Sequence, residues 1–118
     1  MSEVVFHRLD LPAVMAGLER YARDELGVRP EVREVILIGS LARDDWSARS
    51  DADVVVLVDR ADQPGPFRGP DYAPRRSPGV PVDVLVYTPQ EQESWTPRFR
   101  REVERGRRLY ERKAPSTL

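Results

Sequence analysis

The chain has 118 residues, of which 40% are hydrophobic and 33% charged, and its formal net charge is −1. This length predicts a single domain, residues 1–118, with one packed core. Its longest apolar run, Val54–Val58, is far shorter than the roughly 20 residues that span a bilayer, and the N-terminus lacks the cationic start and long apolar stretch of a secretory signal. We therefore expect a cytoplasmic protein that does not contact a membrane.

The rare residue types exclude several classes of site. The sequence has no cysteine and one histidine, His7, so disulfides, cysteine nucleophiles and histidine metal clusters are excluded. We expect His7 at the surface. The only lysine is Lys113, and a phosphate-binding loop of the GxxxxGKS or GxxxxGKT type is excluded because no lysine follows a glycine-rich turn. The balanced charge makes direct binding of nucleic acid by bulk electrostatics an unfavoured reading.

The first predicted element is a helix over residues 11–26. Asp10 and Pro12 are typical of its start, and Gly27 is typical of its end. Its apolar side chains recur at the spacing of one helical face. They are Leu11, Val14, Met15, Leu18, Ala22 and Leu26.

Four strands are predicted, of which the first three are rich in β-branched and apolar side chains. They cover residues 33–38, 52–58, 82–87 and 107–111. Between the first two strands, Gly39-Ser40 predicts a tight turn, residues 41–45 a short helix, and residues 46–50 a loop.

Residues 62–81 are rich in proline and glycine. Because each proline removes a backbone donor and fixes φ, we expect neither regular helix nor central strand here. A loop of this length is either a loose connection between strands or a functional element.

Two short helices are predicted after the third strand. Thr88-Pro89 and Thr96-Pro97 each pair an N-cap residue with a proline in the first turn, and we expect the second helix to end at Gly106. The order of the elements predicts an α/β or α+β fold, in which helices pack on a small sheet.

The most informative segment is residues 39–58. Gly39-Ser40 at a strand end lets the backbone approach phosphate oxygens and adds a hydroxyl donor, although such a pair also occurs in ordinary turns. Asp51 and Asp53 are two residues apart in an extended run, so both project to one face, either as a solvated strand start or as a site. Two like charges side by side are costly without a cation between them, and magnesium binds carboxylates together with substrate phosphates.

Asp83 is the third candidate carboxylate. It interrupts an apolar strand, where a carboxylate is costly without a partner, and it shares its face with Leu85 and Tyr87. A structural role requires a fixed partner such as an arginine. A catalytic role places Asp83 beside Asp51 and Asp53 instead.

These residues carry a family resemblance. Ser40, ten intervening residues and then Asp51-x-Asp53 resemble the GSx10DxD pattern of the nucleotidyltransferase domain in the DNA polymerase β superfamily. With its VDVLVY strand and its ending RREVERGRRLYER, the chain resembles in particular the minimal nucleotidyltransferases (MNT). These are short prokaryotic proteins, often paired with an HEPN-domain ribonuclease as a toxin–antitoxin system. The resemblance covers about residues 32–112, although Asp44 follows Arg43 where many relatives have GSxARG.

The resemblance implies a nucleotidyltransferase fold, with a small mixed sheet, and nucleotidyl transfer from ATP or another nucleoside triphosphate with two magnesium ions. It implies that Gly39 and Ser40 contact phosphate and that Asp51 and Asp53 bridge the metal ions. Asp83 would complete the metal site and position or deprotonate the acceptor hydroxyl. For the acceptor, the resemblance implies a tyrosine hydroxyl on a cognate HEPN-type toxin.

Several nearby residues have more than one interpretation. Arg43 either contacts a triphosphate or forms an ion pair with an acidic neighbour, and Arg49 is a further candidate phosphate contact. Trp46 either stacks on a base or is a partly buried surface aromatic. The basic segment near the C-terminus is expected to be a solvated helix face, with contact to a partner or RNA as the alternative.

Two other functions remain open at this point. A binding module that neutralises a partner stoichiometrically, with a vestigial nucleotide site, is expected to have lost a carboxylate or the Gly-Ser pair, and none is missing here. A small-molecule nucleotidyltransferase needs an acceptor pocket, for which 118 residues leave little room beyond a catalytic core. A partner or a second copy of the chain, as in a homo-oligomer, would then have to complete it.

Overall fold

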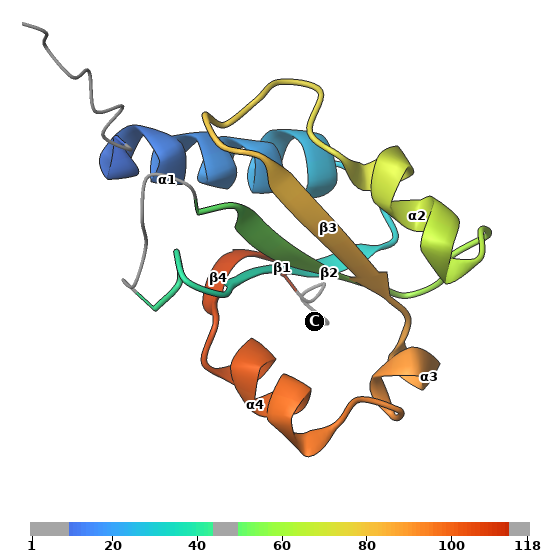
Figure 1. Ribbon diagram of the computed structural model, residues 1–118. Helices are drawn as coiled ribbons and strands as arrows, with labels where there is room; N and C mark the ends of the chain where they lie inside the picture. Colours follow the sequence, from blue (N-terminus) through green and yellow to red (C-terminus); the bar gives the residue numbers. More distant parts are fainter. Residues whose placement is uncertain (1–9, 44–49, 114–118) are drawn as a thin grey trace, which may run out of the picture.

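The computed structural model describes residues 10–43 and 50–113, and this part of the chain begins with a helix that changes its winding halfway (Figure 1). Helix α1, Leu11–Arg20, starts at Asp10, whose carboxylate accepts a hydrogen bond from the Ala13 N–H at 3.2 Å. It continues without a break into the π-helix η1, Tyr21–Leu26, which ends where the Gly27 N–H donates to the Ala22 carbonyl. The predicted bounds of 11–26 are therefore confirmed, with a wider winding in the second half.

The sheet is mixed and has the strand order β3-β2-β1-β4. Strand β2 runs antiparallel to β1 and parallel to β3, while β4 runs antiparallel to β1. The four strands agree with the predicted ones to within one residue. Their bounds are Val32–Ile38 for β1, Ala52–Val58 for β2, Val82–Tyr87 for β3 and Arg107–Glu111 for β4.

Helices cover both faces of this sheet, with α1 on one side and α4, Pro97–Glu104, on the other (Figure 1). The strands place alternate side chains on the two faces, so each face has its own apolar cluster. The cluster under α1 and η1 includes Leu18, Tyr21, Leu37, Val54 and Val56. The cluster under α4 consists of Ile36, Ile38, Val55, Leu57 and Val103.

Both threonine-proline pairs start short helices, as predicted. Helix α3, Pro89–Gln92, begins with a capping box in which the side chains of Thr88 and Glu91 each bond to the other's backbone N–H. In α4 the Thr96 hydroxyl accepts from the Phe99 N–H at 3.1 Å. Helix α4 ends at Glu104, two residues before the predicted stop at Gly106.

The expectation for residues 62–81 is wrong in one part, because Gly65–Tyr72 form helix α2. Pro66 lies in the first turn, where its missing N–H has no helical partner to lose, and Pro70 removes only one hydrogen bond from a two-turn helix. Tertiary contacts also stabilise α2, which lies along the free edge of β3. There the buried Arg68 guanidinium donates to the Val86 carbonyl at 3.3 Å and pairs with Glu91 at 2.5 Å.

This arrangement brings three element ends together. Strand β1 ends at Ile38 where β2 begins, since the two strands are antiparallel and Ile38 pairs with Asp53. Strand β3 begins at the same end of the sheet because it is parallel to β2. No helix within residues 10–43 and 50–113 is long and apolar enough to cross a membrane.

Candidate active site

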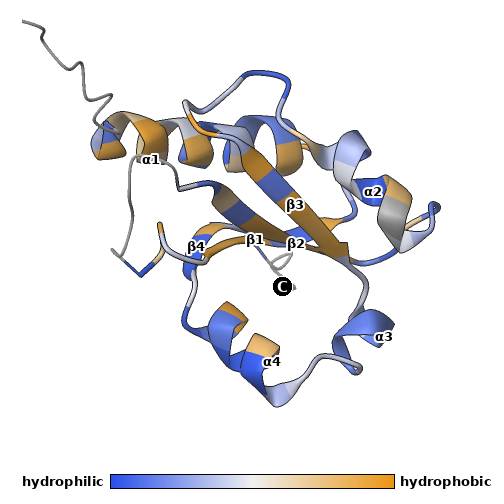
Figure 2. Ribbon diagram, viewed as in Figure 1, coloured by the Kyte–Doolittle hydropathy of each residue, from blue (hydrophilic) through white to orange (hydrophobic). Residues whose placement is uncertain are grey.

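The candidate carboxylates lie where β2 and β3 begin. Asp53 in β2 and Asp83 in β3 are register partners, and neighbouring strands lie about 4.8 Å apart. Asp51 immediately precedes β2 and is two residues from Asp53, so its side chain projects toward the same face. Polar bands interrupt the otherwise apolar ribbons of β2 and β3 in Figure 2. The parallel register therefore adds Asp83 to the pair that the sequence spacing had placed together.

The environment of Asp53 disfavours the charged form of its carboxylate. Partial burial raises the pKa of Asp53 above its ordinary value, and the negative charges of Asp83, Asp51 and Glu102 raise it further, while Arg43 lowers it. A carboxylate destabilised in this way gains from any cation that binds beside it. The electrostatics of the site therefore favour the binding of a cation.

Gly39 directly follows β1 and lies against Asp53. Its φ is +81°, a conformation that favours glycine, and a Cβ built on it would lie 2.6 Å from the Asp53 Oδ2. The Gly39 carbonyl accepts from the N–H groups of Ala42 and Arg43 at 3.1 and 3.2 Å. Instead of the short helix predicted over 41–45, the structure has a hydrogen-bonded turn up to Arg43, and residues 44 and 45 lie outside the described part.

Ser40 connects this turn to the segment that leads into β2. Its hydroxyl donates to the Ser50 hydroxyl at 3.2 Å, and Ser50 directly precedes Asp51. The sequence pattern indicates Ser40 only as a phosphate donor and does not single out Ser50. The structure gives Ser40 a second role, because the hydrogen bond fixes the turn relative to the carboxylates.

Asp83 has none of the partners that a structural role requires. Within residues 10–43 and 50–113 its side chain makes no hydrogen bond or ion pair, and it is exposed. Leu85, its neighbour on the same face, is 37% exposed. The strand tolerates the carboxylate because this part of the sheet face is open to solvent. Asp83 is therefore not part of a core ion pair with any described residue.

Arg43 pairs with an acidic residue at the edge of a cleft. Its guanidinium lies 3.5 Å from a carboxylate oxygen of Glu102 on α4, and the Arg43 side chain is exposed while that of Glu102 is about one third exposed. Both residues line a cleft of about 390 Å³, whose lining also includes Gly39, Arg98, Arg101 and Arg105. We call it the basic cleft. The motif pattern does not place Arg98, Arg101 and Arg105 in the site, although their spacing of three and four residues indicates a shared helix face.

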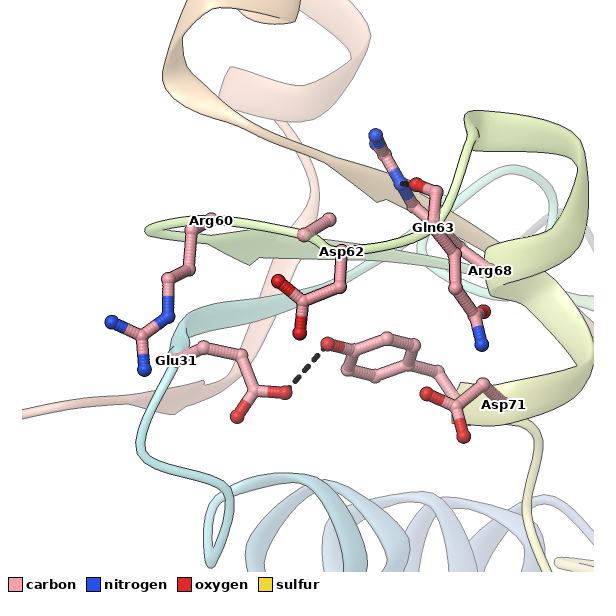
Figure 3. Close-up of a pocket in the computed structure, with 8 residues that line it drawn as sticks. Glu31, Arg60, Asp62, Gln63, Arg68 and Asp71 are labelled. Carbon is pink, nitrogen blue, oxygen red and sulfur yellow. Dashed lines mark hydrogen bonds between the residues drawn. The ribbon is translucent and has the colours of Figure 1, made fainter.

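A second cavity, of about 180 Å³, lies at the opposite end of β2 (Figure 3). Two of its contacts are hydrogen bonds between lining residues. The Tyr72 hydroxyl donates to Glu31 at 2.6 Å, and the Arg68 Nε donates to the Gln63 carbonyl at 2.7 Å. This cavity lies at the far end of the strand from Asp53 and contains none of the candidate site residues.

The donor atoms of the carboxylates indicate whether they fit a metal ion. Within the described ranges, no three acidic or histidine side chains are grouped closely enough to hold a metal ion by themselves. Magnesium, however, is usually bound by one or two carboxylates together with substrate phosphates. Asp53 and Asp83, with Asp51 beside them, supply oxygen donors whose mutual repulsion a cation relieves. The residues therefore fit a magnesium ion that enters with a nucleotide.

Three residues discussed above, His7, Trp46 and Arg49, lie outside the described part of the chain. The remaining candidates fall into two sets. Gly39, Ser40, Asp51, Asp53 and Asp83 lie at one end of the sheet. Arg43 lies beside them at the edge of the basic cleft.

The chain is similar to known proteins in both sequence and fold. Residues 19–110 match the family described as "Nucleotidyltransferase domain", whose members generally use a nucleoside triphosphate and a divalent metal. A crystal structure from Sulfolobus solfataricus, described as a "putative nucleotidyltransferase", is similar in fold, with a TM-score of 0.60 and 18% sequence identity over 86% of this chain and 84% of that one. No curated protein matches the chain. The family match spans the strands and the turn of the candidate site, and the chain therefore belongs to the nucleotidyltransferase domain family and is a nucleotidyltransferase.

Proposed function

We propose that this nucleotidyltransferase transfers AMP from ATP to an acceptor hydroxyl with the help of magnesium. One observation carries the proposal. Asp53 and Asp83 are register partners on an open sheet face, and Gly39 packs its backbone directly against Asp53. Paired carboxylates beside a backbone turn are the parts that phosphoryl-type transfer requires.

The proposed reaction exchanges one phosphorus–oxygen bond for another. The acceptor oxygen forms a bond to the α-phosphorus of ATP, and the bond between that phosphorus and the bridging oxygen of pyrophosphate breaks. The acceptor proton passes to a carboxylate oxygen of Asp83, which is exposed and has no partner among the described residues. Pyrophosphate then leaves.

The chain's other site residues bind and orient the donor. Asp51, Asp53 and Asp83 would hold magnesium together with phosphate oxygens, and the ion would supply charge stabilisation for the attacking and leaving oxygens. The turn that starts at Gly39 presents its backbone and the Ser40 hydroxyl to phosphate. Because the Glu102 contact of Arg43 is long and exposed, the guanidinium is available to a phosphate oxygen. Arg49 is proposed as a further phosphate contact on its sequence position alone.

For the acceptor we propose a hydroxyl, such as that of tyrosine, on an HEPN-type toxin. Two features support a protein acceptor. The chain resembles the minimal nucleotidyltransferases in its motif, and the face around Asp83 and Leu85 is exposed. An acceptor side chain carried on the surface of another protein can reach a carboxylate placed in this way.

A labelling experiment tests the proposal. The protein is incubated with magnesium, ATP labelled at the α-phosphate, and an HEPN-domain protein as the candidate acceptor. The matched control is the double variant Asp51→Asn/Asp53→Asn, which keeps the shape of both side chains and removes their charge. We expect label on the partner and pyrophosphate release with the wild type only. Parallel reactions with the other three nucleoside triphosphates test the preference for ATP.

The same pair of proteins distinguishes catalysis from simple binding. If the double variant protects cells from the toxin as well as the wild type does at equal expression, the protein neutralises its partner by binding, and the proposed transfer is wrong. Pyrophosphate release with a small-molecule hydroxyl acceptor and without label on the partner would retain the reaction and contradict the acceptor.

A further inference from the structure

Three arginines, two in α4 and one at its C-terminal cap, have no partner within the described part of the chain. Arg98, Arg101 and the cap residue Arg105 are exposed, and none of them makes a side-chain hydrogen bond or ion pair with another described residue. We call them the α4 arginines. Many other arginines of the fold are paired with carboxylates. Examples are Arg29, Arg68, Arg107, Arg108 and Arg112. The contrast singles out the α4 arginines.

Their spacing places them on one side of the helix. Residues three, four and seven apart share a helical face, and the apolar side of α4, which contains Val103, packs on the sheet. Like charges three and four residues apart repel each other and destabilise a helix. The arginines therefore repel one another in the free protein and make the lining of the cleft positively charged.

The basic cleft leads to the carboxylates. Its described lining has four arginines and one glutamate, a net charge of +3. Gly39 lines it and also lies against Asp53, and the charges of Arg43 and Glu102 both act on the pKa of Asp53. A chain of phosphates with one end at Asp53 can therefore continue into the cleft.

We propose that the basic cleft binds the polyphosphate tail of the donor nucleotide through Arg98, Arg101 and Arg105. The choice of ligand rests on the proposed function, since the reacting phosphorus must lie beside Asp53. Planar guanidinium groups match phosphate oxygens in pairs of hydrogen bonds, which suits arginine better than lysine. Glu102 repels the phosphates and pairs with Arg43 at 3.5 Å, so the affinity for polyphosphate is lower than four arginines alone would give.

The test measures binding of inorganic tripolyphosphate by calorimetry, without magnesium or acceptor. The variant Arg98→Gln/Arg101→Gln/Arg105→Gln should weaken binding by about tenfold or more, because an exposed charge pair contributes up to about fivefold in affinity. The matched control is Arg20→Gln/Arg75→Gln/Arg76→Gln, which removes three charges elsewhere and should leave binding unchanged. Glu102→Gln should tighten it. Melting temperatures show that each variant is folded.

Several outcomes would overturn the assignment. They are no binding of tripolyphosphate to the wild type, equal weakening in both triple variants, and unchanged binding in the α4 variant. Loss of affinity for single-stranded RNA in the α4 variant, with tripolyphosphate binding intact, would assign the cleft to nucleic acid instead.

The transfer assay separates this inference from the proposed function. If tripolyphosphate binding follows the expected pattern but no transfer occurs, the basic cleft stands and the proposed reaction fails. If transfer occurs and the KM for ATP is unchanged in the α4 variant, the proposed reaction stands and the cleft assignment fails.

Discussion

Adding a methyl group at position 39, in the variant Gly39→Ala, should reduce activity much more than it reduces stability. In Gly39→Ala the new Cβ would lie 2.6 Å from the Asp53 Oδ2, about 0.8 Å short of the 3.4 Å at which ordinary contact begins. The contacted atom is the end of a side chain, so the Asp53 carboxylate can rotate away at little cost in folding energy. The backbone, with φ at +81°, adds about 1–2 kcal/mol for a residue with a side chain.

The expected loss in activity is much larger than the loss in stability. A displacement of about 1 Å in a reacting group costs on the order of 100-fold in rate, so kcat/KM for nucleotidyl transfer should fall by about that factor. The assay pairs this rate with the free energy of unfolding from urea titration. We expect a drop of about 1–2 kcal/mol, which leaves the protein folded at 25 °C.

Gly79→Ala is the matched control. Gly79 also has a positive φ, of +107°, but a Cβ there would meet only Val14 Cγ2, at an ordinary 3.4 Å. This variant should lose stability like Gly39→Ala and keep its activity. Equal kcat/KM in the two variants would refute the reasoning, because it would mean that the contact between Gly39 and Asp53 has no part in the reaction.

Three further predictions concern charged side chains. Asp83→Asn should lower the transfer rate by at least about 100-fold, and its melting temperature should equal or exceed that of the wild type, because no ion pair is lost; a destabilised but active variant would contradict this. Burial and neighbouring carboxylates raise the pKa of Asp53, so the charged form destabilises the folded state above that pKa. Asp53→Asn should therefore melt higher than the wild type at pH 7, and the gap should close as the pH falls below the unfolded value of about 3.9. Arg68→Leu should lower the free energy of unfolding by about 1.5–3 kcal/mol, because the Val86 carbonyl and Glu91 lose their donor; urea titration gives the value, and no loss would show that α2 is held by other contacts.

Local sequence patterns were sufficient for most of the secondary structure. The β-branched and apolar runs in residues 52–58 and 82–87 predicted strands β2 and β3, and the threonine-proline pairs predicted where α3 and α4 begin. These signals are short-range, because side-chain period and capping depend on neighbours in the sequence. Asp51 and Asp53 could be placed on one face for the same reason.

The tertiary structure decided what depends on contacts between distant segments. Residues 65–72 form a helix despite their prolines because the edge of β3 and the buried Arg68 stabilise it. The parallel register places Asp83 opposite Asp53, and the packing of α4 brings Glu102 to Arg43. Each is a pairing between residues at least 18 positions apart, and no local period encodes it. The sequence by itself determined the strands, the helix starts and the Gly-Ser and Asp-x-Asp motif, whereas the site's third carboxylate position and its basic cleft exist only once the sheet and α4 have packed.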